Sequence, residues 1–172
     1  MGVLVEAISV LVRRATLEAS YPGGVPQYDT DCPNGTFCMD AHLTRVGFML
    51  PSDVQAYVAR LERSGLRFME GGKCKDIAIV DQLRGSTMPC DWVLVGTHPK
   101  GFTVAWYPGT SPTPMVCPNG WSLEQIRELH FSGDTEAPGR LLRLSESEGL
   151  ISYLDMKTGM EVCVGRAMPE QL

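Results

Sequence analysis

Residues 51–65, PSDVQAYVARLERSG, carry the strongest structural signal in the chain, because a helix start, a helix face and a helix end occur together. Ser52 with Gln55 matches a capping box, and Gly65 is a typical C-terminal stop. Four apolar residues recur at i, i+3, i+4 and i+7 and so share one face: Val54, Tyr57, Val58 and Leu61. The segment therefore predicts an amphipathic helix that packs on a sheet or on another helix.

Runs rich in Val, Ile, Leu and aromatic residues predict the strands. These runs lie at residues 3–12, 43–50, 66–69, 76–82, 91–96, 102–107, 140–146, 149–155 and 160–165. Residues 13–21 predict a short helix, and residues 121–129 predict the second main helix, with Ser122 and Gln125 as its capping box. Residues 25–40 are rich in turn formers and predict a long loop, a kind of segment that is often functional.

Residues 43–96 and 102–166 both follow the order strand, helix, strand, strand, strand. A pair of such βαβββ units resembles, at the level of the fold, the vicinal-oxygen-chelate arrangement of the glyoxalase-like proteins. That resemblance implies His, Gln or Glu metal ligands on the strands, and the sequence lacks a matching set. We therefore predict one α+β domain over residues 1–172, a largely antiparallel sheet with two main helices on one face. Sub-units 1–97 and 98–172 remain the alternative.

Composition and charge narrow the class of partner. The net charge of −5 argues against a general nucleic-acid binder and against an anionic membrane surface, since both attract Lys and Arg. The apolar N-terminal run precedes its arginines, which is the wrong order for a signal peptide, and no stretch reaches the about 20 apolar residues of a membrane span. We expect a cytoplasmic protein whose six cysteines are reduced thiols, metal ligands or core residues.

The turn-rich stretch DCPNGTFCMDAH, residues 31–42, places Cys32, Cys38 and His42 close together in the chain. Thiolate and imidazole are ligands that zinc prefers, so these three residues are the candidate metal site, with zinc as the candidate cofactor. The C-x5-C-x3-H spacing falls outside the usual zinc-finger pattern, and a loop held by Asn-Gly turn chemistry is the alternative. A thiol nucleophile activated by a histidine is a further hypothesis for the same residues.

Aromatic and charged residues around the middle strands form a second candidate group. Trp92, Trp106 and Tyr107 fall on neighbouring predicted strands, where aromatic side chains can line a ligand pocket or pack in the core. Asp81 and Arg84 lie near strand ends, where polar groups can converge on the same pocket or be solvated turn residues. These five residues are the candidate ligand-binding set.

The leading hypothesis from sequence is a cytoplasmic, non-enzymatic binding protein, of the regulatory or immunity type, that recognises a protein partner with its acidic surface or with residues 22–42. The motifs of phosphate-binding loops, serine hydrolases and zinc proteases are absent from the sequence. The alternative is a small metal- or thiol-dependent enzyme, or a small-molecule-binding domain, that uses Cys32, Cys38 and His42. A homodimer formed through a sheet edge is compatible with either hypothesis.

Overall fold

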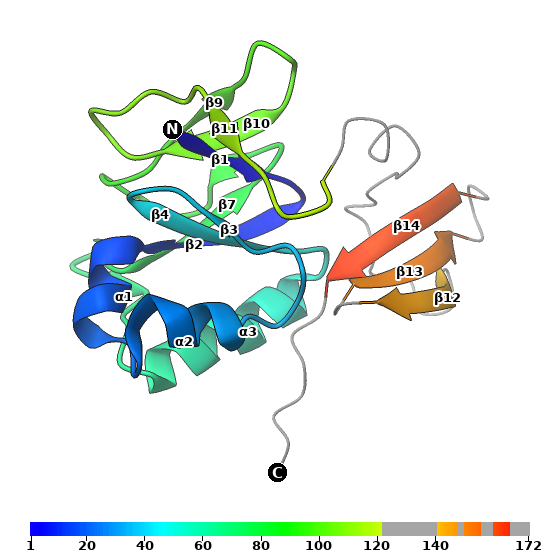
Figure 1. Cartoon of the computed structure of the whole chain (residues 1–172), viewed down its shortest axis with the longest axis horizontal. Helices are drawn as coiled ribbons and strands as arrows, with labels where there is room; N and C mark the ends of the chain where they lie inside the picture. Colours follow the sequence, from blue (N-terminus) through cyan, green and yellow to red (C-terminus); the bar gives the residue numbers. More distant parts are fainter. Residues whose placement is uncertain (122–140, 148–149, 156–159, 166–172) are drawn as a thin grey trace.

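The computed structural model describes residues 1–121, 141–147, 150–155 and 160–165. It confirms the predicted α+β class, since three helices and several antiparallel sheets lie within these ranges (Figure 1). The strands divide among four separate sheets, whereas the sequence predicted one. The physical reason for this difference is a sharp corner near the N-terminus.

The predicted strand at residues 3–12 is in fact two strands, β1 (Gly2–Val5) and β2 (Ile8–Arg13), which belong to different sheets. Ala7 between them has a φ of 48°, in the left-handed region that residues other than glycine rarely adopt. The corner redirects the chain from one sheet into the other. The single-strand prediction is wrong because apolar residues are buried on both sides of the corner, so hydrophobicity does not reveal the change of direction.

β2 is the central strand of a five-stranded antiparallel sheet with the order β3-β4-β2-β7-β8. The other members are β3 (Cys38–Met39), β4 (Leu43–Phe48), β7 (Ile77–Asp81) and β8 (Gly85–Ser86). Consecutive strands β7 and β8 form a hairpin, in which Asp81 pairs with Gly85. β8 is therefore the outer edge of this sheet.

β1 belongs to a four-stranded sheet with the order β11-β1-β10-β9. Its other strands are β9 (Leu94–Thr97), β10 (Thr103–Trp106) and β11 (Met115–Val116), and only the β1–β11 pair is parallel. β9 and β10 form the hairpin that the THPKG segment predicts, closed by a 2.7 Å hydrogen bond from the His98 N–H to the Phe102 carbonyl. Because this hairpin crosses the boundary at residue 97, the two alternative sub-units share one sheet.

Three helices cover one face of the five-stranded sheet (Figure 1). They are α1 (Arg14–Ser20), α2 (Gly24–Thr30) and α3 (Pro51–Arg63). The apolar stripe predicted for α3 is buried as a unit, and it packs with Val10 and Val12 of β2 and with Phe48 of β4. The predicted second main helix, at residues 121–129, lies almost wholly outside the described residues, and so do Ser122 and Gln125.

Two local predictions on this side of the sheet are wrong. Residues 25–40 are not one long loop, because all of α2 except Gly24 lies within them. The helix is held by Tyr28, whose buried hydroxyl accepts a 2.9 Å hydrogen bond from Tyr57. Ser52 is not the N-cap of α3, since the helix begins at Pro51 and Leu50 takes the cap position without a side-chain bond. Proline is well suited to the first helical position, and the helix starts two residues earlier than the capping box indicates.

The other face of the five-stranded sheet packs against the four-stranded sheet. Leu11 of β2 and Ala78 of β7 face Val3, Val5 and Ala105 of the four-stranded sheet in a second apolar core. The main body therefore has three layers: helices, five-stranded sheet and four-stranded sheet. β2 contributes alternate residues to the two cores, as the period of two along a strand requires.

Two smaller sheets complete the described structure. β5 (Met69–Glu70) pairs with β6 (Lys73–Cys74) in a short hairpin. β12 (Leu141–Ser147), β13 (Leu150–Asp155) and β14 (Met160–Gly165) form a three-stranded antiparallel sheet beside the main body (Figure 1), at the three positions that the sequence predicts. Within the described ranges, none of the helices has the length and apolar character needed to cross a membrane.

Candidate functional site

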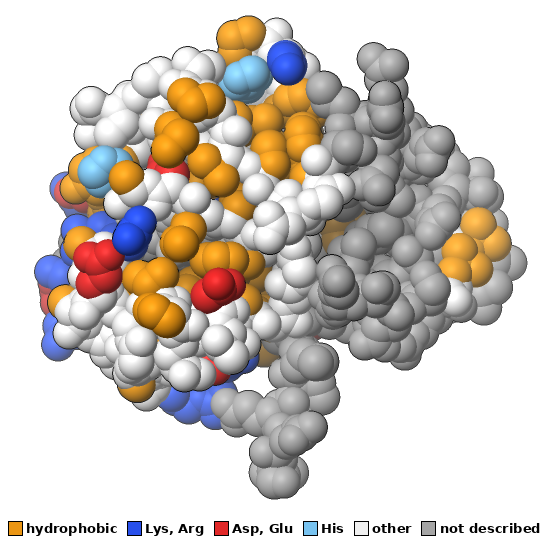
Figure 2. All heavy atoms as spheres, in the orientation of Figure 1, with side chains coloured by type: hydrophobic (Ala, Val, Ile, Leu, Met, Phe, Trp, Pro, Cys, Tyr) orange, Lys and Arg blue, Asp and Glu red, His pale blue; other side chains and the backbone are white. Residues whose placement is uncertain are grey.

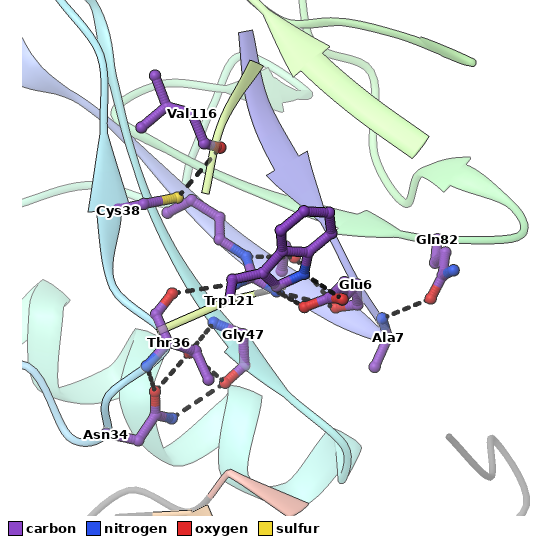
Figure 3. Close-up of polar contacts among 11 residues, drawn as sticks. Glu6, Ala7, Asn34, Thr36, Cys38, Gly47, Gln82, Val116 and Trp121 are labelled. Atoms are coloured by element: carbon purple, nitrogen blue, oxygen red, sulfur yellow. Dashed lines mark hydrogen bonds and ion pairs between the residues drawn. The ribbon is translucent and has the colours of Figure 1, made fainter. Parts of the chain in front are cut away.

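The stretch 31–42 is tied to β4 through Asn34 and Thr36. The buried Asn34 side chain donates to the Gly47 carbonyl at 3.0 Å and accepts from the Thr36 backbone N–H at 3.0 Å. The Thr36 hydroxyl also accepts from the Gly47 N–H at 2.8 Å (Figure 3). The Asn-Gly turn is thus bonded to a central strand of the core, which favours a structural role for this turn.

Cys32 and Cys38 lie on opposite faces of the five-stranded sheet. Cys32 packs against the core beneath the helices, whereas Cys38 is buried in the core between the two sheets. The Cys38 thiol points toward the Val116 carbonyl, 3.8 Å away. The His42 side chain is exposed and stacks on the Tyr107 ring, with 5.0 Å between ring centroids. Across the described ranges, no three His, Cys, Asp or Glu side chains are grouped to hold a metal ion.

Both thiols are held in their protonated form. Burial, with a smaller contribution from the Asp29 carboxylate, raises the pKa of the Cys32 thiol to about 12. Burial also raises the pKa of the Cys38 thiol to about 11, although the Arg45 cation acts in the opposite direction. Because the thiolate is the nucleophile and the metal ligand, these environments disfavour both kinds of chemistry at neutral pH.

The three aromatic residues of the second candidate group do not line one pocket. Trp92 is buried between the two main sheets, where its indole N–H donates to the Cys74 carbonyl at 3.0 Å. Tyr107 packs partly buried against the same core. Trp106 lies on the opposite face of β10 from the buried Ala105, because neighbouring residues of a strand point to opposite faces.

Asp81 and Arg84 stand at the two sides of the β7–β8 turn. One Asp81 carboxylate oxygen, Oδ1, accepts from the Leu83 N–H at 2.8 Å and from the Arg84 N–H at 2.9 Å. Gly85, with a φ of 81°, closes the turn in a conformation that favours glycine. Between them, Leu83 is 91% exposed, the largest value among the large apolar side chains whose burial the structure describes. We call residues 81–85 the Leu83 turn.

Sequence reasoning missed Gln82, which holds this turn to the rest of the molecule. The Gln82 side-chain oxygen accepts from the Ala7 N–H at 2.8 Å, and the Gln82 N–H donates to the Ala7 carbonyl at 2.8 Å (Figure 3). The Thr103 hydroxyl of β10 donates to the Gln82 carbonyl at 3.0 Å. No sequence signal indicates these bonds, since Gln82 lies far along the chain from Ala7.

Sequence reasoning also missed Arg45, which is 1% exposed and lies in a strand that is buried along its whole length. Its guanidinium donates to the Ser9 hydroxyl and to the Thr36 carbonyl, each at 3.0 Å, and to the Glu6 carbonyl at 3.3 Å. A Cβ atom on Gly47 would overlap this guanidinium, which explains the glycine two residues further along β4. An arginine with a glycine two residues later, inside a predicted strand, is the signal that could have revealed the site.

The Glu6 carboxylate lies beside Arg45 at the corner between β1 and β2. Its Oε2 atom is 3.9 Å from the guanidinium, and its Oε1 atom accepts a 2.9 Å hydrogen bond from the Trp121 indole (Figure 3). Burial lowers the pKa of Arg45, while nearby thiols and Glu6 act against that change. Every guanidinium nitrogen thus has a partner within the chain, an arrangement that ties β4 to the corner rather than one that is free to bind a substrate.

Comparison with models of protein families, with curated proteins and with solved structures found no match for this chain. The function is therefore inferred from the chain's own structure, above all from the Leu83 turn and the environments of the cysteines.

Proposed function

We propose that the chain is a non-enzymatic binding protein that acts in the cytoplasm and recognises a protein partner through the Leu83 turn. One observation carries the proposal: a nearly fully exposed leucine stands on a turn whose backbone is held from several sides. A single exposed apolar side chain is ordinary on a protein surface, and the bonds that hold its turn are what distinguish Leu83.

The turn is held within itself and from two other elements. Asp81 bonds the two N–H groups at the tip, at 2.8 and 2.9 Å. Gln82 is bonded to the Ala7 corner and to Thr103 of β10. A loop that is already ordered loses little conformational freedom on binding, so more of the contact energy remains as affinity. This preorganisation supports a recognition role for Leu83.

Other exposed apolar side chains follow in the next stretch of chain. Among the side chains whose burial the structure describes, five large apolar ones are exposed: Met1, Leu83, Met88, Leu94 and Leu144. Leu83, Met88 and Leu94 come from the segment that contains β8 and β9, the edge strands of their two sheets. Figure 2 shows that apolar side chains reach the surface over the four-stranded sheet. Edge strands also offer backbone groups to which a partner can bond.

The chemistry of the partner is inferred from charge. With a net charge of −5, the chain attracts a protein with a basic surface more readily than a nucleic acid or an anionic membrane. Most of the acidic surplus lies in the sequence from residue 122 onward. The five cysteines whose side chains the structure describes are all free, as expected in a reducing compartment, which supports the cytoplasmic assignment.

The alternative function, a metal- or thiol-dependent enzyme or a small-molecule-binding domain, has less support. It needs Cys32, Cys38 and His42 to act together, whereas the two thiols lie in different cores and His42 is exposed on Tyr107. It also needs a thiolate, and burial raises the pKa of both thiols. The binding hypothesis requires neither condition.

Site-specific photo-crosslinking in the native cell tests the proposal. A benzophenone amino acid replaces Leu83 in one variant and Gln55, an exposed residue on α3, in the control. We expect one defined heterologous product from the Leu83 position and none from the Gln55 position. The absence of a product at Leu83, equal products at both positions, or a product of twice the chain mass would overturn the proposal, the last because it would indicate a second copy of this chain.

A further inference from the structure

Cys74 and Cys90 lie side by side, although sixteen positions separate them in the chain. The Cys74 N–H donates to the Pro89 carbonyl at 2.8 Å, and the Trp92 indole donates to the Cys74 carbonyl at 3.0 Å. Lys73 and Asp91 form an ion pair at 3.5 Å between the same two segments. These three contacts hold the segment 89–92 against β6.

The two side chains lie close together within this arrangement. Each thiol is among the groups that change the pKa of the other. Both pack in the core between the two main sheets, with Cys74 only 4% exposed and Cys90 partly exposed. Two cysteines on neighbouring segments of one core can be joined when their β-carbons approach to about 3.5–4.5 Å, the range that a disulfide requires.

We propose that Cys74 and Cys90 are a redox-active thiol pair that forms a reversible intramolecular disulfide by exchange with a low-molecular-weight disulfide such as oxidised glutathione. This site is distinct from the Cys32, Cys38 and His42 set and does not depend on the partner proposed above. Cys90 is the sulfur that the oxidant reaches first, because its side chain is the more exposed of the two.

The exchange proceeds in two balanced steps. The Cys90 thiolate attacks one sulfur of the small disulfide, so that a mixed disulfide forms and one small thiolate leaves. The Cys74 thiolate then attacks the Cys90 sulfur, so that the protein disulfide forms and the second small thiolate leaves. The two protein thiols lose two electrons and two protons, and the small disulfide is reduced to two thiols.

The environment of the pair makes the exchange slow at neutral pH and directs it to the disulfide between Cys74 and Cys90. Burial raises the pKa of Cys74 to about 11 and also raises the pKa of Cys90, so few thiolates exist at any moment. Once the mixed disulfide forms on Cys90, the adjacent Cys74 resolves it within the molecule. In a reducing compartment the pair stays reduced, and it closes when the small-disulfide concentration rises.

Peptide mapping of the full chain tests this proposal. The protein is incubated with oxidised glutathione at mildly alkaline pH, blocked with an alkylating reagent and digested with trypsin without reduction. We expect the peptide of residues 74–75 joined to the peptide of residues 85–100, with the loss of two hydrogen atoms and without glutathione. Reduction should separate the two peptides. Closure of this loop should also raise the thermal midpoint by about 5–10 °C.

Single serine variants provide the controls. Cys74→Ser should stop at Cys90 joined to glutathione, which also shows that the variant retains an accessible Cys90, whereas Cys32→Ser should form the disulfide as the wild-type chain does. A wild-type chain that retains glutathione on Cys90, joins Cys90 to another cysteine or links two chains would overturn the proposal. None of these outcomes depends on the Leu83 turn. The disulfide proposal and the partner proposal can therefore fail independently.

Discussion

Gln82 and Ala7 are joined by two hydrogen bonds, one from the Ala7 N–H to the Gln82 side-chain oxygen and one from the Gln82 N–H to the Ala7 carbonyl, each 2.8 Å long. Ala7 is the corner at which the chain passes from the four-stranded sheet into the five-stranded sheet. Gln82 belongs to the Leu83 turn. The contact therefore couples the geometry of the fold to the orientation of the proposed recognition residue.

Replacement of Gln82 by alanine should lower the free energy of unfolding by about 1–2 kcal/mol, because the Ala7 N–H loses its acceptor. Urea unfolding measures the change. Gln27→Ala is the matched control, since its side chain makes one exposed hydrogen bond, 2.8 Å, to Asp31. That control should cost less than about 0.5 kcal/mol. Equal costs for the two variants would show that the Gln82 contact does not hold the turn.

Replacement of Arg45 by methionine should lower the free energy of unfolding by about 3–5 kcal/mol, because the Glu6 carboxylate and the Thr36 carbonyl lose a buried charged donor. Arg14→Met is the control, since the ion pair of Arg14 with Glu18 lies at the surface and is worth about 0.5 kcal/mol or less. Urea unfolding of both variants measures the difference. A loss below about 1 kcal/mol for Arg45→Met would contradict a structural role for the buried cation.

Replacement of Cys32 and Cys38 by serine should have independent effects on stability, because the two thiols pack in cores on opposite faces of the five-stranded sheet. The change in unfolding free energy of the double variant should equal the sum of the single changes within about 0.5 kcal/mol. Thermal or urea unfolding of the wild-type chain, the two single variants and the double variant gives the double-mutant cycle. A coupling above about 1 kcal/mol would indicate that the two thiols share a site, as the metal hypothesis requires.

Stability should fall as the pH rises above about 9, because burial raises the pKa values of Cys32 and Cys38. The stabilisation that the two protonated thiols contribute is fully present below the pKa of an unfolded cysteine, about 8.5. It is lost as the pH approaches the pKa values in the folded protein, about 11 for Cys38 and about 12 for Cys32. Each thiol should remove about 1.4 kcal/mol per pH unit in this window. Urea unfolding between about pH 8 and about pH 10 measures the slope, and the double serine variant should show a shallower one.

Elements with a local pattern were predicted from the sequence. The stripe of α3 and the strands β12, β13 and β14 lie where the patterns place them, since apolar periodicity records which face of an element is buried. α2 was missed because its residues are poor helix formers and Pro26 lies in its first turn. Its helix depends on Tyr28, whose burial against Tyr57 is a tertiary contact.

The candidate sites were harder to predict than the elements. Cys32 and Cys38 are close in the chain, but they pack in cores on opposite faces of the five-stranded sheet, and no spacing rule records that. Cys74 and Cys90, distant in the chain, are the cysteines that the fold brings onto neighbouring segments of one core. Asp81 and Arg84 were noticed as polar residues near a strand end, whereas the exposed Leu83 between them acquires meaning only from the bonds that hold the turn.

The affinity for the cross-linked partner tests the recognition role of Leu83 most directly. Leu83→Asp places a charge at the centre of the proposed contact, and Leu144→Asp places the same charge at another exposed leucine, which is 50% exposed on β12. Titration calorimetry should show a loss of about 30-fold or more in affinity for Leu83→Asp, as for an anchoring interface residue, and little change for Leu144→Asp. An unchanged affinity for Leu83→Asp in a folded variant would contradict the account.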